Sequence, residues 1–274
     1  MEPGSDRLNA PLRVALAGAG NVASHLAAAL SISKVCKLVA IASRTPDHAS
    51  ELAAMAGCKP CLYSEIALAR PDVVIVSVAD RAVADVVGQI GHIGESVLVL
   101  HTSGTLDKSC LEPISLRTGI FYPFQTFTKG FKVDMAEVPF FIETAFKEDY
   151  AEADTLARSI SPYVYSSDEE RRRHLHIAGV FTSNFVNVLL GVVEEELGEA
   201  GYPAEVAVPL LRQTIEKAAS IGTFAAQTGP AVRGDIAVMK SQLATLAPQY
   251  REVYKVLSEL IMKKHNSADE QDKL

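Results

Sequence analysis

A glycine-rich turn near the start of the chain, Gly-Ala-Gly-Asn-Val-Ala at residues 18–23, constrains the fold more than any other segment. An apolar run at residues 12–17 precedes it, and an alanine-rich, helix-like segment at residues 24–30 follows. A strand, a glycine turn and a helix in this order are typical of a dinucleotide-binding unit. Gly18 permits the tight turn, and Gly20 leaves room for a pyrophosphate beside the helix N-terminus, whose free N–H groups attract phosphate. The predicted phosphate-binding residues are Gly18, Gly20, Asn21 and Val22.

The end of the next predicted strand, residues 37–42, indicates which dinucleotide binds. Sites that prefer NAD usually carry an acidic residue about 20 residues after the glycines, where it bonds the ribose 2′-hydroxyl. Here the first carboxylate is Asp47, and the strand instead ends in Ser43, Arg44 and Thr45. Arg44 can form charge-assisted bonds to a 2′-phosphate with the two hydroxyls as further donors, or it is a solvated arginine that starts the next helix. We predict NADP(H) rather than NAD(H).

Composition and charge restrict the function classes further. A net charge of −7 and an isoelectric point near 5.5 give no support for binding to nucleic acid or to an anionic membrane. Residues 1–11 do not resemble a signal peptide, and no apolar run approaches the roughly 20 residues that cross a bilayer. Cys58 and Cys61 have zinc-like spacing without a second ligand pair, so we expect structural thiols and no metal site. We expect a cytoplasmic protein that does not bind a membrane.

Two patterns of secondary structure divide the chain. Up to residue 167, short apolar strand-like segments alternate with helical ones, which predicts an α/β fold with a doubly wound, mainly parallel sheet. From residue 168 helical periodicity dominates, which predicts an all-helical second domain. The expected helices of this second half lie at residues 168–200, 203–226, 235–246 and 248–264. The predicted domains are therefore residues 1–167, which bind the nucleotide, and residues 168–274.

The segment that follows the fourth predicted strand, residues 72–78, is the next candidate for cofactor binding. Ligands of open α/β sheets lie at the carboxyl ends of the strands. Val78, Ala79 and Asp80 are therefore placed to contact the ribose and nicotinamide of the cofactor. The carboxylate of Asp80 has an alternative role, because it could cap the helix expected to begin at Arg81.

The segment after the fifth predicted strand, residues 96–100, carries an imidazole and two hydroxyls. His101 could exchange a proton with a substrate near neutral pH, with Ser103 close to it, or it could be a hydrogen-bonded turn histidine. A further strand end, residues 122–127, supplies aromatic side chains and an amide, which suit either a pocket wall or a surface turn.

Three features of the second half could contribute to a site. Asn184 lies in an apolar part of the long helix and needs a polar partner, either a substrate or a neighbouring backbone. Arg233 lies in a glycine- and proline-containing segment just before a helix, where it could bind an anion or simply pair with Asp235. The three arginines at residues 171–173 follow three acidic residues and are expected to be a solvated mixture of charges.

Five motifs taken together resemble one family of NADP oxidoreductases. They are the glycine turn at residues 18–23, His-Thr-Ser-Gly at 101–104, Tyr-Pro-Phe-Gln-Thr-Phe at 122–127, His-Ile-Ala-Gly-Val-Phe-Thr-Ser-Asn-Phe at 176–185 and Thr-Gly-Pro-Ala-Val-Arg-Gly-Asp at 228–235. That family has a Rossmann-like N-terminal domain and a helical C-terminal domain of unassigned function. It is related to pyrroline-5-carboxylate reductase and to the β-hydroxyacid dehydrogenases. The resemblance implies a helical domain that forms a homodimer and a substrate cleft between the domains.

The sequence departs from these relatives at two positions. The family often has His-Pro where this chain has Tyr122-Pro123, which counts against an acid–base role at that position. The β-hydroxyacid dehydrogenases carry a catalytic lysine one helical turn before an asparagine, whereas Val180 occupies that position relative to Asn184. Reduction of an imine therefore fits the resemblance better than oxidation of a hydroxyacid.

We therefore predict an NADP(H)-dependent oxidoreductase that transfers hydride to or from a small, anionic imine or carbonyl substrate. The predicted catalytic residues are His101, Ser103, Asn184 and Arg233. An alternative is a catalytically silent NADP(H)-binding sensor or assembly protein, which the missing lysine favours. A methyltransferase with the same glycine turn is less consistent, because Arg44 stands where an acidic residue would hold the ribose hydroxyls.

Overall fold

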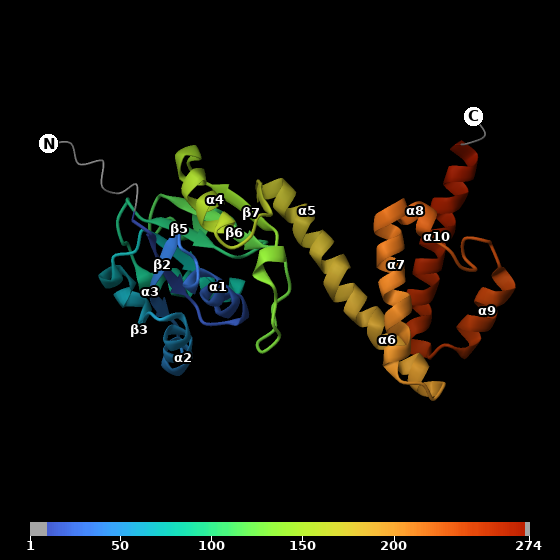
Figure 1. Cartoon of the computed structure of the whole chain (residues 1–274). Helices are drawn as coiled ribbons and strands as arrows, with labels where there is room; N and C mark the ends of the chain where they lie inside the picture. Colours follow the sequence, from blue (N-terminus) through green and yellow to red (C-terminus); the bar gives the residue numbers. More distant parts are fainter. Residues whose placement is uncertain (1–9, 272–274) are drawn as a thin grey trace. The chain divides into compact units, whose positions relative to one another are not determined.

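The computed structural model describes the backbone of residues 10–271 and the side chains of residues 10–265. Its first part is an eight-stranded sheet with the strand order β3-β2-β1-β4-β5-β6-β7-β8 (Figure 1). The strands are β1 (Leu12–Ala17), β2 (Cys36–Ala42), β3 (Lys59–Cys61), β4 (Val73–Val76), β5 (Leu98–His101), β6 (Thr118–Pro123), β7 (Phe140–Thr144) and β8 (Val164–Ser166). The β6–β7 pair is antiparallel and every other neighbouring pair is parallel. The prediction of a doubly wound, mainly parallel sheet is confirmed.

Both faces of this sheet are covered, which explains why its strands are continuously apolar. Successive residues of a strand point to opposite faces, so Leu16 belongs to one buried cluster and Ala15 to the other. The first cluster includes side chains of α1 (Asn21–Ser31), α2 (Pro46–Ala56) and α4 (Tyr150–Arg158), and the second those of α3 (Val83–Ile90). Each fully buried leucine or valine contributes about 1.5–3 kcal/mol relative to an exposed one, so the two clusters account for the stability of the sheet.

The second half of the chain is helical, as predicted. Its helices are α5 (Glu169–Gly179), α6 (Val186–Glu199), α7 (Val208–Ile221), α8 (Thr223–Ala226), α9 (Ile236–Thr245) and α10 (Arg251–Gln271). A π-helical segment, Val180–Phe185, joins α5 to α6, so the expected long helix is continuous but carries one wide turn. Asp168 accepts a hydrogen bond from the Arg171 amide at 2.9 Å and caps α5. Asp235 caps α9 through the Val238 amide at 3.2 Å, as the sequence predicts.

The chain divides into two compact units, which we name unit 1 (residues 1–183) and unit 2 (residues 184–274). The division falls inside the π-helical segment, so α5 belongs to the unit that contains the sheet. The domain boundary at residue 167 stays a prediction, since packing units and domains defined by sequence need not coincide.

One charged residue shows why α5 belongs to unit 1. Arg172 is buried, pairs with the Glu143 carboxylate of β7, and donates a hydrogen bond to the Leu106 carbonyl oxygen at 3.0 Å. Lys108 contacts the same carboxylate at 2.5 Å. The expectation that all three arginines at residues 171–173 are solvated is therefore wrong for the middle one. The helix turns this residue alone toward a buried carboxylate.

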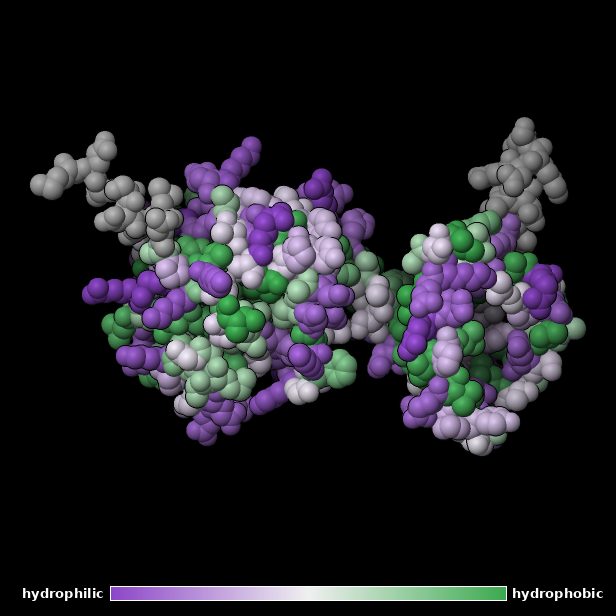
Figure 2. Space-filling view, in the orientation of Figure 1, coloured by the Kyte–Doolittle hydropathy of each residue, from purple (hydrophilic) through white to green (hydrophobic). Residues whose placement is uncertain are grey.

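The helical run Glu169–Glu199 is the one segment, among the residues described, that is long and apolar enough to cross a membrane by length and composition. This run was not expected from the sequence, because polar but uncharged residues interrupt its apolar residues. None of its apolar window is buried in the single chain. Figure 2 shows hydrophobic side chains gathered at the surface of unit 2 between charged ones.

Candidate cofactor and active site

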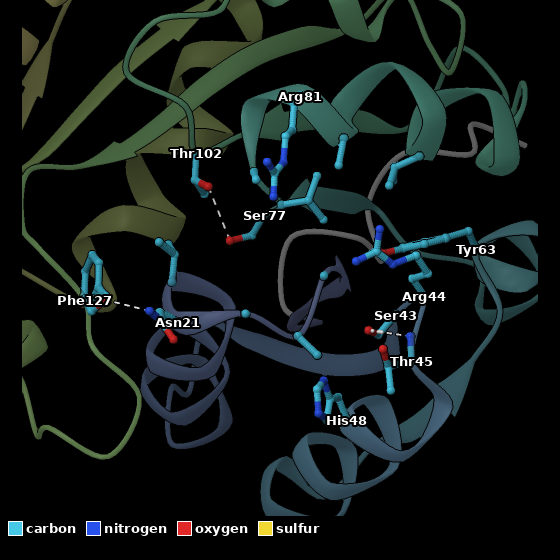
Figure 3. A pocket seen from close by; sticks show the side chains of 18 of the residues that line it. Asn21, Ser43, Arg44, Thr45, His48, Tyr63, Ser77, Arg81, Thr102 and Phe127 are labelled. Atoms are coloured by element: carbon cyan, nitrogen blue, oxygen red, sulfur yellow. Dashed lines mark hydrogen bonds between the residues drawn. The ribbon is translucent and has the colours of Figure 1, made fainter.

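A cavity of about 670 Å³ lies at the carboxyl ends of the central strands. Nine of the ten residues predicted to bind the cofactor line it, and only Asp80 does not. Figure 3 shows Asn21 and Phe127 on one side of this cavity, Arg44 and Tyr63 on the other, and Ser77 and Thr102 between them. The lining residues that were predicted are Gly18, Gly20, Asn21, Val22, Ser43, Arg44, Thr45, Val78 and Ala79.

The glycine turn has the geometry that a phosphate site requires. Gly18 has a φ of +134°, and a Cβ atom there would lie 2.1 Å from the Ser77 carbonyl oxygen. No other residue fits, because the turn passes directly over the end of β4. At Gly20 a Cβ atom would meet nothing within 4 Å, so the space beside the N-terminus of α1 is open. An anion can therefore approach the free N–H groups of that helix.

Arg44 lies in the wall of the cavity beside Tyr63 (Figure 3). Its guanidinium forms no salt bridge with a carboxylate among the residues described. Thr45, not Arg44, is the N-cap residue of α2, and its amide donates a hydrogen bond to Ser43 Oγ at 3.2 Å. The arginine thus faces the site without a salt bridge among the residues described, which leaves it available to a 2′-phosphate. His48 and Arg81 line the same cavity and were not predicted, because neither belongs to a cofactor motif.

Asp80 does not cap the helix that follows it, and its contact with the cofactor stays a prediction. Its carboxylate accepts a short hydrogen bond from Thr105 Oγ1, and it does not line the cavity. The 3₁₀ helix η3 (Asp80–Ala82) has no side-chain cap, so Asp80 does not start the helix by capping. The residue instead connects the end of β4 to the loop that follows β5.

The His101 side chain is fully buried at the end of β5. Its Nδ1 accepts a hydrogen bond from the Ser103 amide at 3.2 Å, and its Nε2 has no hydrogen-bond partner among the residues described. Burial and then the nearby charge of Arg172 lower the pKa of His101 to about 4. The imidazole is therefore neutral at pH 7. This geometry matches the alternative of a hydrogen-bonded turn histidine.

Ser103 and its neighbour Thr102 have different surroundings. Ser103 Oγ accepts hydrogen bonds from the amides of Thr105 and Leu106, both at 3.1 Å, and so stabilises the loop. Thr102 instead lines the cavity, where its hydroxyl donates to Ser77 Oγ at 3.3 Å. The sequence analysis chose Ser103 and missed Thr102. Alternation along the strand would have identified it, because His101 and Ser103 share one face and Thr102 points to the other.

The loop after β6 closes one side of the cavity. Gln125 and Phe127 line it, and the Asn21 side chain donates a hydrogen bond to the Phe127 carbonyl oxygen at 2.9 Å. The His25 ring packs against that of Phe127 with centroids 4.9 Å apart. The loop is thereby joined to α1, the helix whose N-terminus faces the predicted phosphate site.

The other two predicted catalytic residues, Asn184 and Arg233, belong to unit 2 and are both exposed. Asn184 lies in the π-helical segment, a kind of turn that is frequent at functional sites. Arg233 lies in the loop before α9 and pairs with no carboxylate among the residues described, so the Arg233–Asp235 pair considered as an alternative is not formed. Their catalytic roles stay predictions.

The cysteines carry no sign of reactivity. Cys58 and Cys61 are free and partly buried, and burial raises the pKa of the Cys61 thiol to about 11. Both therefore remain protonated at neutral pH, which agrees with structural thiols. The side chains described include no group of three or more His, Cys, Asp or Glu that could hold a metal ion.

Comparisons with known proteins give a match for each part of the chain. Residues 13–103 match the family "NADP oxidoreductase coenzyme F420-dependent", and residues 138–261 match a domain of unknown function, DUF2520. A proposed NADP oxidoreductase from Bacteroides fragilis is 36% identical, with a TM-score of 0.82 over 92% of this chain and 98% of its own. No curated protein matches.

Two more distant structures share the fold alone. They are a pyrroline-5-carboxylate reductase from Coxiella burnetii (15% identity, TM-score 0.59, 94% of this chain and 98% of its own) and an imine reductase from Myxococcus stipitatus in complex with NADP+ (13%, 0.61, 94% and 94%).

The Rossmann-like sheet, the nucleotide cavity and these matches define the class of NADP-dependent oxidoreductases. The chain belongs to the family that joins an NADP oxidoreductase domain to a DUF2520 domain. The alternative of a silent binding protein gains no support from these matches.

Proposed function

We propose that this protein reduces a small imine or carbonyl compound that carries an anionic group, with NADPH as the reductant. The observation that carries the proposal is the cavity itself, which combines an open phosphate site at α1 with the guanidinium of Arg44 in its wall. The likeness in fold to pyrroline and imine reductases supports an imine substrate. Val180, in place of a lysine one turn before Asn184, argues against the hydroxyacid reaction.

The chain's own residues have three tasks in such a reaction. Reduced nicotinamide, when bound, supplies a hydride, and the protein must hold the cofactor, orient the C=N or C=O group and deliver a proton. The glycine turn would hold the pyrophosphate, and Arg44 with Ser43 and Thr45 would hold the 2′-phosphate. His101 and Ser103 would act by fixing the loop that presents Thr102 to the cavity. Asn184 would orient the substrate, and Arg233 would bind its anionic group in a cleft between the units.

We further propose that unit 2 forms a homodimer. Val253, Val256, Leu257 and Leu260 follow the i, i+3, i+4, i+7 spacing of one face of α10, and each is at least 41% exposed. An apolar helix face of this kind is normally covered, and a second copy of the chain would cover it. A cytoplasmic location suits an acidic protein that uses NADPH.

The cofactor assignment is tested by titration of the purified protein with NADPH and NADH, followed by nicotinamide fluorescence. Substitution Arg44→Ala is expected to raise the Kd for NADPH about 10- to 30-fold, or roughly 1.4–2 kcal/mol, and to leave NADH nearly unchanged. The control is Arg173→Ala, because Arg173 is exposed and pairs only with Glu169 of its own helix among the residues described. An equal loss for both nucleotides would contradict the 2′-phosphate assignment.

The reaction class is tested in the same preparation with 1-pyrroline-5-carboxylate and 1-pyrroline, a charged and an uncharged cyclic imine. We expect loss of NADPH absorbance with both compounds and a lower KM for the carboxylated one. Tight binding of NADPH without turnover of either compound, or of a panel of small keto acids, would contradict the proposed function and favour a silent binding protein.

A further inference from the structure

Three residues from separate elements meet at the end of the sheet, next to the cofactor cavity. Gly104 follows β5, Tyr122 lies in β6, and His176 lies on α5. A Cβ atom at Gly104 would be 2.9 Å from Tyr122 Cζ and 3.0 Å from His176 Nδ1. The hydroxyl-bearing end of the phenol ring and the imidazole therefore both lie against the same backbone position, where only glycine leaves room for them.

The Gly104–Tyr122–His176 group lies close to residues that line the cofactor cavity, which relates it to the proposed reduction. Gly104 comes two residues after Thr102, and Tyr122 three residues before Gln125, and both Thr102 and Gln125 line the cofactor cavity. All of these residues belong to unit 1. Because the carboxyl ends of parallel strands form the ligand edge of such a sheet, a substrate next to the nicotinamide would lie over this group.

We propose that the Tyr122 hydroxyl is the proton donor of the reduction and that His176 is the positioning residue that returns a proton to it. The inference rests on the proposed imine reduction. The hydride goes to the imine carbon, the O–H bond of Tyr122 breaks, and an N–H bond forms at the imine nitrogen. The phenolate then takes a proton from the His176 ring, and the exposed ring regains one from the solvent. One NADPH and one proton are consumed for each amine formed.

The surroundings of Tyr122 suit a proton donor. Its side chain is partly buried, and its hydroxyl has no hydrogen-bond partner among the residues described, so it is free to bind a substrate atom. Phe124 holds the ring edge-on, with centroids 6.3 Å apart and an interplanar angle of 75°. Burial raises the pKa of Tyr122 above its ordinary value, so the phenol keeps its proton at neutral pH until a substrate nitrogen takes it.

His176 is held over this site by the helix that carries it. Arg172, one turn earlier on the same face of α5, is buried against Glu143 and fixes the helix to the sheet. One turn later, Gly179 allows Phe124 to approach, with a distance of 3.2 Å between Phe124 Cε2 and the position of a Cβ atom. His176 itself is exposed, which gives it the access to water that the return of a proton needs.

The test is the substitution Tyr122→Phe, which removes the hydroxyl and keeps the ring among its aromatic neighbours. At saturating NADPH and 1-pyrroline-5-carboxylate we expect kcat to fall about 100-fold or more, with the Kd for NADPH unchanged within about twofold. The matched control is Tyr165→Phe, because Tyr165 lies in the same aromatic row, stacked on Phe141 with centroids 5.4 Å apart. Its turnover should equal that of the wild type.

Two further variants test the arrangement. His176→Ala should lower kcat, and added imidazole should restore part of it, which a merely structural role would not allow. Gly104→Ala should separate the phenol from the imidazole and lower kcat without loss of NADPH binding. A Tyr122→Phe variant with more than half of the wild-type kcat would overturn the proton donor and leave the proposed function intact. A wild-type protein that binds NADPH and turns over keto acids but neither imine would overturn this inference alone. Absence of turnover with all of these compounds would overturn the proposed function as well.

Discussion

Unit 1 and unit 2 bury their apolar side chains to very different extents. Unit 1 contains two buried clusters, one on each face of the sheet. In unit 2 the only buried apolar side chains among residues 184–265 are Ala231 and Met239. Both halves of the sequence are rich in apolar residues, so the difference lies in how these residues are covered. Unit 1 buries its apolar side chains within one chain, whereas unit 2 leaves apolar helix faces exposed in the single chain.

The difference matters for function because each unit has a separate task. The cofactor cavity and the Gly104–Tyr122–His176 group are built entirely on unit 1, whose sheet holds them rigidly. Asn184 and Arg233 are carried by unit 2, and both are exposed in the single chain. Cofactor binding should therefore depend on unit 1 alone, and use of an anionic substrate on the association of unit 2.

The largest effect is expected from the core of unit 1. Phe121 is fully buried in β6, and its ring contacts that of Phe140 with centroids 4.9 Å apart. Phe121→Ala should lower the free energy of unfolding by about 3–5 kcal/mol, because it removes apolar contacts and leaves a cavity. Urea unfolding measures the loss, which should not depend on protein concentration. Phe146→Ala, at a ring 45% exposed, is the control and should cost about 1 kcal/mol or less. A concentration-dependent loss at Phe121 would mean that unit 1 also needs a partner.

A second test uses the titration of His101 in the core of unit 1. Its pKa is lowered from 6.5 to about 4 in the folded protein, so between these values the unfolded chain binds a proton that the folded chain does not. Stability should therefore fall as the pH falls from about 6.5 to about 4, by about 3 kcal/mol in total. Unfolding of unit 1, followed from pH 7 to pH 4.5, measures this slope.

The control for that slope is His101→Leu, which removes the titrating group. The variant is less stable at pH 7, because the Ser103 amide loses its acceptor, but its stability should decline less steeply toward acid. Equal slopes for the variant and the wild type would show that other groups account for the acid sensitivity.

The sequence predicts the site best where local backbone chemistry decides the structure. The glycine turn needs only a few neighbouring residues, so Gly18 and Gly20 were identified from spacing alone, and Arg44 from its place at a strand end. Thr102 was missed and Ser103 chosen because both are hydroxyls in one loop, and only Thr102 lines the cavity. Residue chemistry alone cannot separate two adjacent hydroxyls, whereas the alternation that continues from β5 does.

Long-range packing accounts for the other corrections. Arg172 sits between two arginines that pair with Asp168 and Glu169 near the start of α5, and nothing in the sequence separates it from them. Its burial follows from Glu143, a residue of a strand 29 positions away. The meeting of Tyr122 with His176 depends likewise on how α5 packs on the sheet.

The smallest effect is expected on the surface of unit 2. It tests directly whether a second chain covers the apolar side chains that unit 2, unlike unit 1, leaves exposed. Leu257 and Leu260 are 41% and 58% exposed on the apolar face of α10. If a second chain covers this face, Leu257→Ala or Leu260→Ala should weaken the dimer by about 1–2 kcal/mol each, or roughly 5- to 30-fold in its dissociation constant. Analytical ultracentrifugation over a dilution series measures that constant. Leu68→Ala, at a side chain 79% exposed in unit 1, is the control and should leave association unchanged. A monomeric wild type at all concentrations would contradict the dimer, and unit 2 would then need a different partner to cover its helices.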